Sequence, residues 1–184
     1  MSGDAPASHR AYAPAEVRCA VLTVSDSRTL EDDTSGKLIR ELLAARGHRT
    51  VEHRIVSDDR EVIRLAVLRS LARDDVDAVI ATGGTGVSPR DVTPEAVEPL
   101  LEKPLAGFGE IFRALSFQEI GAAAILSRAL AGSSGGKVVY VLPGSSGAVR
   151  LAVERLIGPE LAHVVGQLRR KDAPPSAHRE HARK

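Results

Sequence analysis

Residues 77–86 read DAVIATGGTG, an apolar run that ends in three glycines within four positions. The run has the length and the Val and Ile content of a strand that is buried on both faces of a sheet. Glycine permits positive φ angles and leaves backbone amides bare, so the loop after the strand could hold a phosphate. The other interpretation is a flexible turn from strand to helix. The stretch matches neither a Walker A motif nor the dinucleotide-binding glycine pattern.

Strand and helix patterns alternate on both sides of this stretch. Short runs rich in Val and Ile predict further strands at 17–24, 50–56 and 137–142. Apolar residues at helical spacing predict helices at 36–46, after Asp59, from 93, over most of 107–131 with breaks near Ser116 and Gly121, and at 145–157. This order implies parallel strands joined by right-handed crossovers. We therefore expect a three-layer α/β/α sandwich with a mostly parallel central sheet.

The sequence predicts one domain, residues 16–168, between two flexible tails. Residues 1–15 are rich in small residues and Pro, and residues 169–184 are basic and include two consecutive prolines. A chain of 184 residues can bury a core that needs no disulfide or metal. We expect Cys19, the one cysteine, to be a buried apolar residue.

Composition argues against several classes of function. The net charge is +1 and aromatic residues make up 3% of the chain, so we expect no nucleic-acid partner. No apolar stretch approaches the roughly 20 residues that span a bilayer, and the first residues lack a signal-peptide pattern. We expect a cytoplasmic protein with no membrane partner. The histidines at 48, 53 and 163 show no metal-ligand spacing.

Carboxylates follow the predicted strands, which is where ligands bind in sheets of this kind. Asp26, Asp58, Asp59 and Asp91 each come after a strand or after the glycine loop. Carboxylates beside a phosphate are typical of a Mg²⁺ site, whereas an Asp directly before a helix can instead cap that helix. We favour capping for Asp59. Asp91 is free for a ligand in this interpretation, because Thr93 supplies the cap of the next helix.

A second loop of small polar residues follows the strand at 137–142. Residues 144–147 read GSSG, which lacks the Gly-x-Ser-x-Gly pattern of a nucleophile elbow. Glycine and serine at the start of a helix fit an anion-facing loop better. The sequence therefore offers two candidate phosphate loops and no evident covalent nucleophile.

Seven short motifs occur in order along about residues 17–165: LTVSD at 22–26, DTSG at 33–36, TGGTG at 82–86, RDVTPEA at 90–96, GFGE at 107–110, LSR at 126–128 and LPG at 142–144. In this order and spacing they resemble the MoaB/Mog family of molybdenum cofactor biosynthesis proteins. The segment FQEIG at 117–121 is closer to the MoaB branch.

The resemblance implies the molybdopterin-binding fold, a three-layer α/β domain that assembles into trimers or hexamers. Active members bind molybdopterin, a pterin with a dithiolene and a terminal phosphate, and transfer AMP from Mg-ATP to that phosphate. The product, adenylyl-molybdopterin, is ready for molybdate insertion. The resemblance thus implies molybdopterin as substrate, ATP as co-substrate, Mg²⁺ as cofactor and a molybdate-insertion enzyme as a partner.

The resemblance also implies which residues form the site. Asp58 and Asp91 match the family's two acidic positions, and would hold Mg²⁺ and orient the reacting phosphates. The phosphate would lie on Thr82, Gly83, Gly84, Thr85, Gly86 and Ser88. The rest of the pocket would be lined by Ser25, Asp26, Ser35, Gly36, Glu110, Ser127, Arg128, Pro143, Gly144 and Ser145.

Two alternatives stay open at the level of sequence. Ser57 stands where relatives commonly have Pro, so Asp59 could be the working carboxylate in place of Asp58. A carrier that holds molybdopterin without turning it over is the second function. Both acidic positions of the family are filled in this chain, which favours the enzyme.

Overall fold

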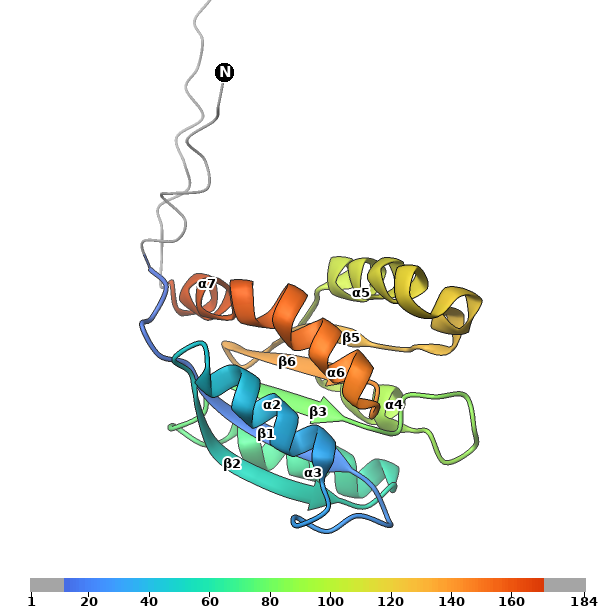
Figure 1. Cartoon of the computed structure of the whole chain (residues 1–184). Coiled ribbons are helices and arrows are strands. Elements are labelled where there is room, and N and C mark those ends of the chain that lie inside the picture. Colours follow the sequence, from blue (N-terminus) through green and yellow to red (C-terminus); the bar gives the residue numbers. More distant parts are fainter. Residues whose placement is uncertain (1–11, 171–184) are drawn as a thin grey trace, which may run out of the picture.

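The computed structural model describes residues 12–170, in which six strands form one sheet between two layers of helices (Figure 1). The strand order across the sheet is β2-β1-β3-β6-β5-β4. The strands are β1 Arg18–Val24, β2 Arg49–Val56, β3 Ala78–Thr82, β4 Lys103–Pro104, β5 Leu130–Ser134 and β6 Lys137–Leu142. The helices are α2 Thr34–Ala44, α3 Arg60–Leu71, α4 Thr93–Val97, α5 Ala106–Ile120, α6 Ser146–Ala152 and α7 Gly158–Arg169. Three shorter segments are the 3₁₀ turns η1 Glu98–Leu100 and η2 Gly121–Leu126 and the π-helical η3 Val153–Ile157.

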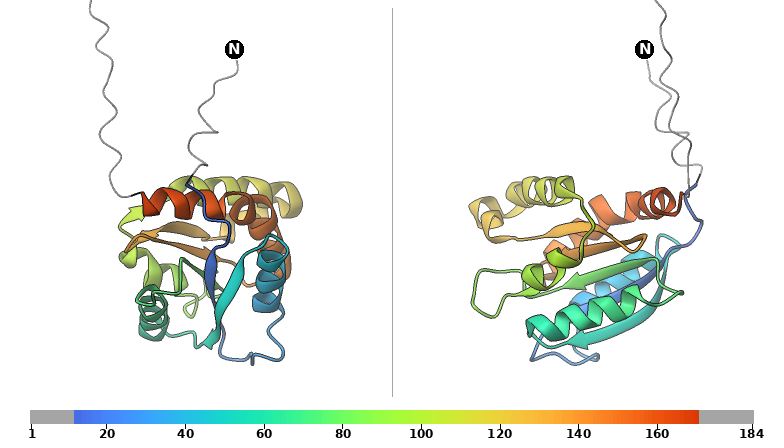
Figure 2. Two further views of the ribbon diagram at one scale, coloured as in Figure 1. Left: turned by 90° about the vertical axis from the view of Figure 1, so that its left-hand side faces the viewer. Right: turned by 180° about the vertical axis from the view of Figure 1, so that it is seen from behind.

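Side chains alternate along the central strands and build one apolar core on each face of the sheet. Cys19 and Val21 of β1 pack in the core beneath α2, α5, α6 and α7, whereas Ala20 and Leu22 pack in the core beneath α3 and α4. Figures 1 and 2 show the two helical layers. The three-layer sandwich is confirmed. Cys19 is buried as predicted, and burial raises the pKa of its thiol to about 12.

The sheet is parallel in one half and antiparallel in the other. β2, β1, β3 and β6 are parallel to one another, but β5 runs antiparallel to β6, and β4 antiparallel to β5. The sequence analysis extended helix over 107–131 and therefore missed β5. A two-residue turn joins β5 to β6, and Gly135 (φ 57°) and Gly136 (φ 73°) supply the two left-handed conformations that this hairpin needs. A Gly-Gly pair between two strand-like runs is the sequence signal for it.

The last helical region is longer than predicted. We expected it to end at Ile157, but η3 leads directly into α7, which continues to Arg169. Pro159 does not interrupt this path because it lies in the first turn of α7, where its missing N–H is not needed. In the same way α5 passes Ser116 without a break and ends at Ile120.

One predicted helix cap is confirmed and one is wrong. The side chain of Asp59 caps α3. The helix predicted at 36–46 is α2, which runs from Thr34 to Ala44 and ends at Ala45, with Gly47 (φ 79°) in the turn that follows. Thr93 does not cap α4, because it is the first residue of that helix and Val92 occupies the cap position. The Thr93 hydroxyl instead donates a hydrogen bond to the carbonyl oxygen of Gly83 at 2.8 Å.

The described ends of the chain lie together beside α7. A Cβ atom on Gly166 would stand 2.5 Å from the carbonyl oxygen of Tyr12, and the Arg170 guanidinium lies 5.0 Å from the centroid of the Tyr12 ring. The remainder of the two predicted tails, 1–11 and 171–184, lies outside the described residues. Within residues 12–170, no helix is long and apolar enough to cross a membrane.

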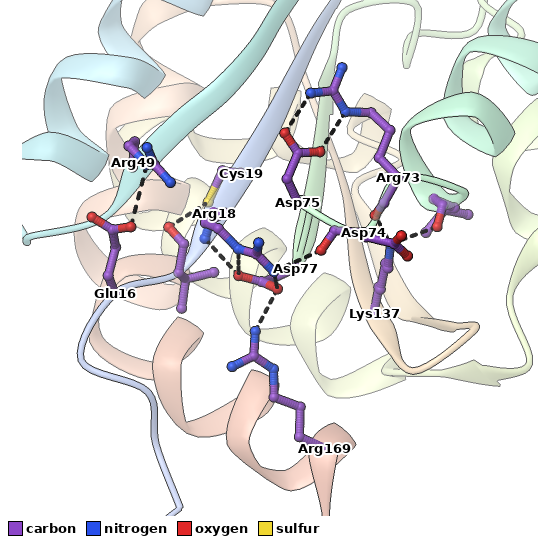
Figure 3. Close-up of polar contacts among 12 residues, drawn as sticks. Glu16, Arg18, Cys19, Arg49, Arg73, Asp74, Asp75, Asp77, Lys137 and Arg169 are labelled. Carbon is purple, nitrogen blue, oxygen red and sulfur yellow. Dashed lines mark hydrogen bonds and ion pairs between the residues drawn. The ribbon is translucent and has the colours of Figure 1, made fainter.

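Asp77 joins three elements at the amino ends of the parallel strands (Figure 3). Its carboxylate accepts hydrogen bonds from the Arg18 backbone N–H at 2.9 Å and from Arg18 Nε at 3.0 Å and Nη2 at 2.8 Å. It also pairs with Arg169 at the end of α7. Burial of Asp77 acts to raise the pKa of its carboxyl, but the hydrogen bonds from Arg18 and Arg169 outweigh it and lower the pKa to about 2.

We expect Asp77→Asn to lower the free energy of unfolding by about 2 kcal/mol at pH 7, because a buried charge-assisted network loses its anion. The contribution of Asp77 is present above its ordinary pKa of 3.8 and is lost as the pH falls toward 2. The difference between the two proteins should therefore shrink across that range. Denaturant titrations at several pH values measure it, with Asp75→Asn, whose carboxylate is half exposed beside Arg73, as a control of little effect.

Candidate functional site

The candidate site lies where the carboxyl ends of three parallel strands meet. Thr23 of β1 pairs with Thr82 of β3, and Thr82 pairs with Leu142 of β6, so the three strands end level with one another. The chain leaves β1 toward β2 on one side and crosses to β3 on the other, which makes this edge a topological switch point. The loop after β3 and the start of η2 lie at the same end of the sheet (Figure 1 and the right-hand view of Figure 2).

Two glycine-containing loops touch each other at this edge. The N–H of Gly83 donates to the carbonyl of Leu142 at 3.0 Å, and a Cβ on Gly144 would lie 3.3 Å from the Cα of Gly83. Gly83 itself has a φ of 103°, and a Cβ there would stand 2.3 Å from the carbonyl oxygen of Val24. A side chain at this position would collide with the end of β1, so only glycine permits this approach.

Three hydroxyl groups bind the loops to the fold. Thr82 donates to the carbonyl of Pro143 at 3.0 Å, and Ser35 donates to the carbonyl of Gly144 at 2.6 Å. The bond from Thr93 to Gly83 described above is the third. The hydroxyls of Thr82 and Ser35 were predicted to face a ligand, but they donate to backbone carbonyl groups. Thr93, which the sequence analysis expected to cap a helix, does the same.

Two N–H groups of the first loop have no partner among the described residues. Within residues 12–170, the N–H groups of Gly84 and Thr85 donate to no acceptor. Gly84 has a φ of 62°, and its carbonyl accepts the N–H of Thr93 at 3.0 Å. Free amides on a loop fixed in this way are the donor surface that phosphate binding requires.

Asp58 lies beside this loop. A Cβ on Gly84 would stand 3.2 Å from Asp58 Oδ1, and the N–H of Asp58 donates to Asp26 Oδ1 at 3.0 Å. Burial of Asp58, and then the negative charge of Asp91, raise the pKa of its carboxyl above the ordinary value. Its neighbour Asp59 faces the other way and accepts the N–H groups of the first turn of α3.

Asp91 anchors the end of the glycine loop as an ionised carboxylate. The hydroxyl of Ser88, and then the backbone N–H groups of Ser88 and Gly86, donate hydrogen bonds that lower the pKa of Asp91. The bond from the Ser88 N–H is 2.9 Å long. A Cβ on Gly86 would lie 2.7 Å from Asp91 Oδ2, so glycine at this position lets the carboxylate fold back on the loop.

Two arginines surround the carboxylates. Arg128 donates to the carbonyls of Thr85 at 3.2 Å and Asp91 at 2.6 Å, and it pairs with Glu95. Arg90, which the sequence analysis did not place in the site, pairs with Asp26. These contacts fix the glycine loop and Asp26 from outside.

The carboxylates fit a metal only together with a ligand. Among the described residues, no group of three or more Asp, Glu, His or Cys side chains could hold a metal ion. Asp58 and Asp91 are close enough for the charge of one to raise the pKa of the other. Mg²⁺ commonly takes one or two carboxylates and completes its shell with substrate phosphates and water, so this pair fits Mg²⁺ bound with a phosphate.

A cavity of about 330 Å³ opens between the loops and α5. Nine of the predicted residues line it: Gly83, Gly84, Thr85, Gly86, Asp91, Ser127, Pro143, Gly144 and Ser145. Glu110 and Arg128 line an adjoining cavity of about 620 Å³ that shares Ser127. Ser88 lines a third hollow together with Asp91. The structure thus gathers most of the predicted residues around one region.

Ser25 has contacts within its own segment, whereas Gly36 lies against residues of β1 and β2. The Ser25 hydroxyl accepts the N–H groups of residues 27 and 28. Gly36 touches a buried polar network, since a Cβ there would lie 2.2 Å from Asp33, 2.4 Å from His53 and 2.7 Å from Thr23. Gly36 therefore lets α2 begin next to this network, and the network holds Ser35 near the second loop.

The sequence analysis missed one wall of the cavity. Its residues are Phe112, Ser116, Ile120, Ala123, Leu126 and Ala148. Three of them recur every four residues along α5, which places them on one side of the helix. This spacing is visible in the sequence, but a buried core stripe has the same pattern.

Comparison with known proteins identifies the family. Residues 20–163 match the family described as "Probable molybdopterin binding domain". The chain belongs to this family. Molybdenum cofactor biosynthesis protein B of Bacillus cereus is 52% identical over 164 residues, which are 89% of this chain and 97% of that protein.

Solved structures agree with this assignment to the molybdopterin-binding domain family. A crystal structure of a Molybdenum cofactor biosynthesis protein B has a TM-score of 0.84 and 54% identity, covering 86% of this chain and 99% of that one. The tungsten cofactor synthesizing protein MoaB from Pyrococcus furiosus has a TM-score of 0.77 and 38% identity, covering 86% and 100%. The resemblance to the MoaB branch is confirmed, and the chain stands among molybdenum cofactor biosynthesis proteins.

In this molybdopterin-binding domain we expect Gly84→Ala to destabilise the fold more than Gly47→Ala, by at least about 1 kcal/mol. Both positions have a left-handed φ, but a Cβ at 84 would lie 2.4 Å from the Thr93 hydroxyl, whereas a Cβ at 47 meets nothing within 4 Å. Chemical denaturation of the two variants measures the difference. An equal decrease in the free energy of unfolding for both variants would mean that the Thr93 side chain moves aside without destabilising the fold.

Proposed function

We propose that the chain is a molybdopterin adenylyltransferase. An oxygen of the terminal phosphate of molybdopterin would form a bond to the α-phosphorus of ATP, while the bond between the α- and β-phosphates breaks and pyrophosphate leaves. The products are adenylyl-molybdopterin and pyrophosphate. Such a transfer needs reactants held in line and negative charge neutralised, and it needs no protein nucleophile.

One observation carries this proposal: Asp58 and Asp91 both lie against a glycine loop in which two backbone N–H groups have no partner among the described residues. The free N–H groups of Gly84 and Thr85 would bind phosphate oxygens. Burial and the charge of Asp91 raise the pKa of Asp58, so a cation bound by these carboxylates would stabilise their ionised forms. A site that binds both an anion and a cation supports phosphoryl-type chemistry.

The chain's own residues would orient the reactants. Asp91 is held rigidly by Ser88 and Gly86, and Asp58 is held through its N–H by Asp26. Mg²⁺ bound by Asp58 and Asp91 would neutralise charge on the phosphates and on the leaving pyrophosphate. The hydroxyl bridges of Thr82, Ser35 and Thr93 keep both loops in place, so that the donors need not reorganise during the reaction.

The proposal is tested by incubating the protein with molybdopterin, MgCl₂ and ATP and measuring adenylyl-molybdopterin by mass spectrometry. We expect Asp58→Asn and Asp91→Asn each to lower the rate roughly 100-fold or more while leaving the fold intact. Asp59→Asn is the matched control, because Asn caps a helix about as well as Asp and the side chain faces α3. It should keep the parent rate.

Two results would argue against the enzyme or against its residue assignment. If the parent protein binds molybdopterin but forms no adenylylated product, it is a carrier, and the two carboxylates serve only to shape the pocket. If Asp59→Asn loses the activity and Asp58→Asn keeps it, the working carboxylate is that of Asp59 and not that of Asp58.

We also propose that the chain forms a homo-oligomer through an apolar face of α5 and η2. Phe117 and Ile125 are 62% and 82% exposed, and they line an apolar hollow with Ala114, Ala122 and Ala124. Exposed apolar patches of this kind mark interfaces between proteins. A second copy of the chain would bury them.

Light scattering tests this assembly. We expect Phe117→Asp to lower the molar mass at micromolar concentration, because a carboxylate would have to be buried in the interface. Val62→Asp on α3, where the side chain is 44% exposed, should leave the mass unchanged. A parent protein that is already monomeric would contradict the proposal.

A further inference from the structure

A buried polar network lies behind the candidate site, between β1, β2 and the start of α2. At its centre is Asp33, whose side chain is 0% exposed. The carboxylate accepts hydrogen bonds from Thr23 Oγ1 at 2.6 Å, from the N–H of Gly36 at 2.9 Å and from His53 Nε2 at 2.8 Å. Asp33 and its three donors lie outside the lining of the cavity beside the glycine loops. The phosphate chemistry proposed above therefore gives this network no task.

A buried carboxylate is a costly way to cap a helix. Asp59 caps α3 from an exposed position, whereas Asp33 has to exchange water for hydrogen bonds within the protein. Burial acts to raise the pKa of Asp33, but the hydrogen bonds from Thr23, Gly36 and His53 outweigh it and lower the pKa. Asp33 is therefore ionised at neutral pH, and its position depends on all three donors.

The two neighbours of the His53 ring determine where it carries its proton. An ionised carboxylate only accepts hydrogen bonds, so Nε2 has to donate to Asp33. On the other side of the ring, Arg40 Nη1 lies 3.4 Å from Nδ1. A guanidinium only donates, so Nδ1 has to accept. This arrangement selects the neutral imidazole with its N–H directed at Asp33.

The network meets the candidate site through the first turn of α2. Asp33 is the N-cap of α2, and its bond to the N–H of Gly36 fixes that turn. Ser35 lies in the same turn and donates to the carbonyl of Gly144 at 2.6 Å. Gly144 in turn packs on Gly83 of the first loop. A shift of the Asp33 carboxylate would therefore move Ser35 and, with it, the loop after β6.

We propose that His53 is a positioning residue for the loop after β6. Its Nε2–H holds the Asp33 carboxylate, and the carboxylate sets the turn from which Ser35 reaches Gly144. His53 acts from β2, the strand at the edge of the sheet, and does not line the cavity. The inference rests on the proposed function, because the loop that His53 positions belongs to the site that would bind the phosphates.

Two substitutions separate the hydrogen bond from the ring. His53→Gln keeps an N–H donor for Asp33, whereas His53→Met fills a similar space without one. In the assay with molybdopterin, MgCl₂ and ATP, we expect His53→Met to lower kcat about tenfold, because a small displacement of binding groups slows the transfer. His53→Gln should keep kcat within about twofold of the parent. The MgCl₂ concentration for half-maximal rate should stay unchanged in both, because Asp58 and Asp91 are intact.

His48→Met is the control for the loss of a buried histidine. His48 is 8% exposed, and its Nδ1 accepts the N–H of Val17 at 3.3 Å, at the opposite end of β1 from the site. This variant should lose stability but keep the parent kcat at a temperature where circular dichroism shows it to be folded. Equal losses of kcat in His48→Met and His53→Met would overturn the inference. If His53→Met does not fold, Thr23→Val replaces it, because it removes another donor to the Asp33 carboxylate.

A double-mutant cycle shows whether His53 acts through Ser35. We expect Ser35→Ala to lower kcat about tenfold, and His53→Met to add less than about twofold in that background, because the bond to Gly144 is already lost. Two independent losses that multiply to about a hundredfold would overturn the inference.

Amide chemical shifts follow the same path without any activity. In ¹H–¹⁵N spectra of the protein without ligand, His53→Met should move the signals of Gly83 and Gly144, whereas His53→Gln and His48→Met should leave them in place. If the signals move in this way but the parent transfers no AMP, the adenylyltransferase is disproved and the positioning role is retained. If the parent transfers AMP and His53→Met changes neither these signals nor kcat, the positioning role is disproved and the enzyme is retained.

Discussion

The contact between Gly83 and Gly144 sets the geometry of the whole functional edge. A side chain on Gly83 would collide with the last carbonyl of β1, and one on Gly144 would press on Gly83. Because both residues lack a side chain, the backbone of the loop after β3 packs directly against the end of β1 and against the loop after β6. The carboxylates, the free amides and the cavity all take their positions from that approach.

Polar groups at this edge fall into two sets with different tasks. The hydroxyls of Ser35, Thr82 and Thr93 are engaged with carbonyl oxygens and serve to fix the loops. The N–H groups of Gly84 and Thr85 and the carboxylates of Asp58 and Asp91 are the set that we propose to contact a ligand. Rigid support and available donors are thus supplied by different residues, as preorganised sites require.

The sequence predicted the layers of the fold well because apolar strands and helical spacing are local patterns. It predicted the glycine loop and the capping role of Asp59 for the same reason. It missed β5 because a five-residue strand that contains a glycine and two serines has little strand character of its own. It also could not separate Thr93 or the α5 wall from ordinary capping and core residues, because their partners are distant in sequence.

The Gly135-Gly136 hairpin has a consequence for the order in which the chain folds. Its two strands are neighbours in sequence, so they can pair after closing a very short loop. By contrast, β1 pairs with β3 across about 60 residues and β3 with β6 across a similar span, and such contacts form slowly. The antiparallel hairpin can therefore form early in folding, and β3 can dock onto β6 only after the long crossover has closed. Completion of the ligand-binding edge thus belongs to the late stage of folding.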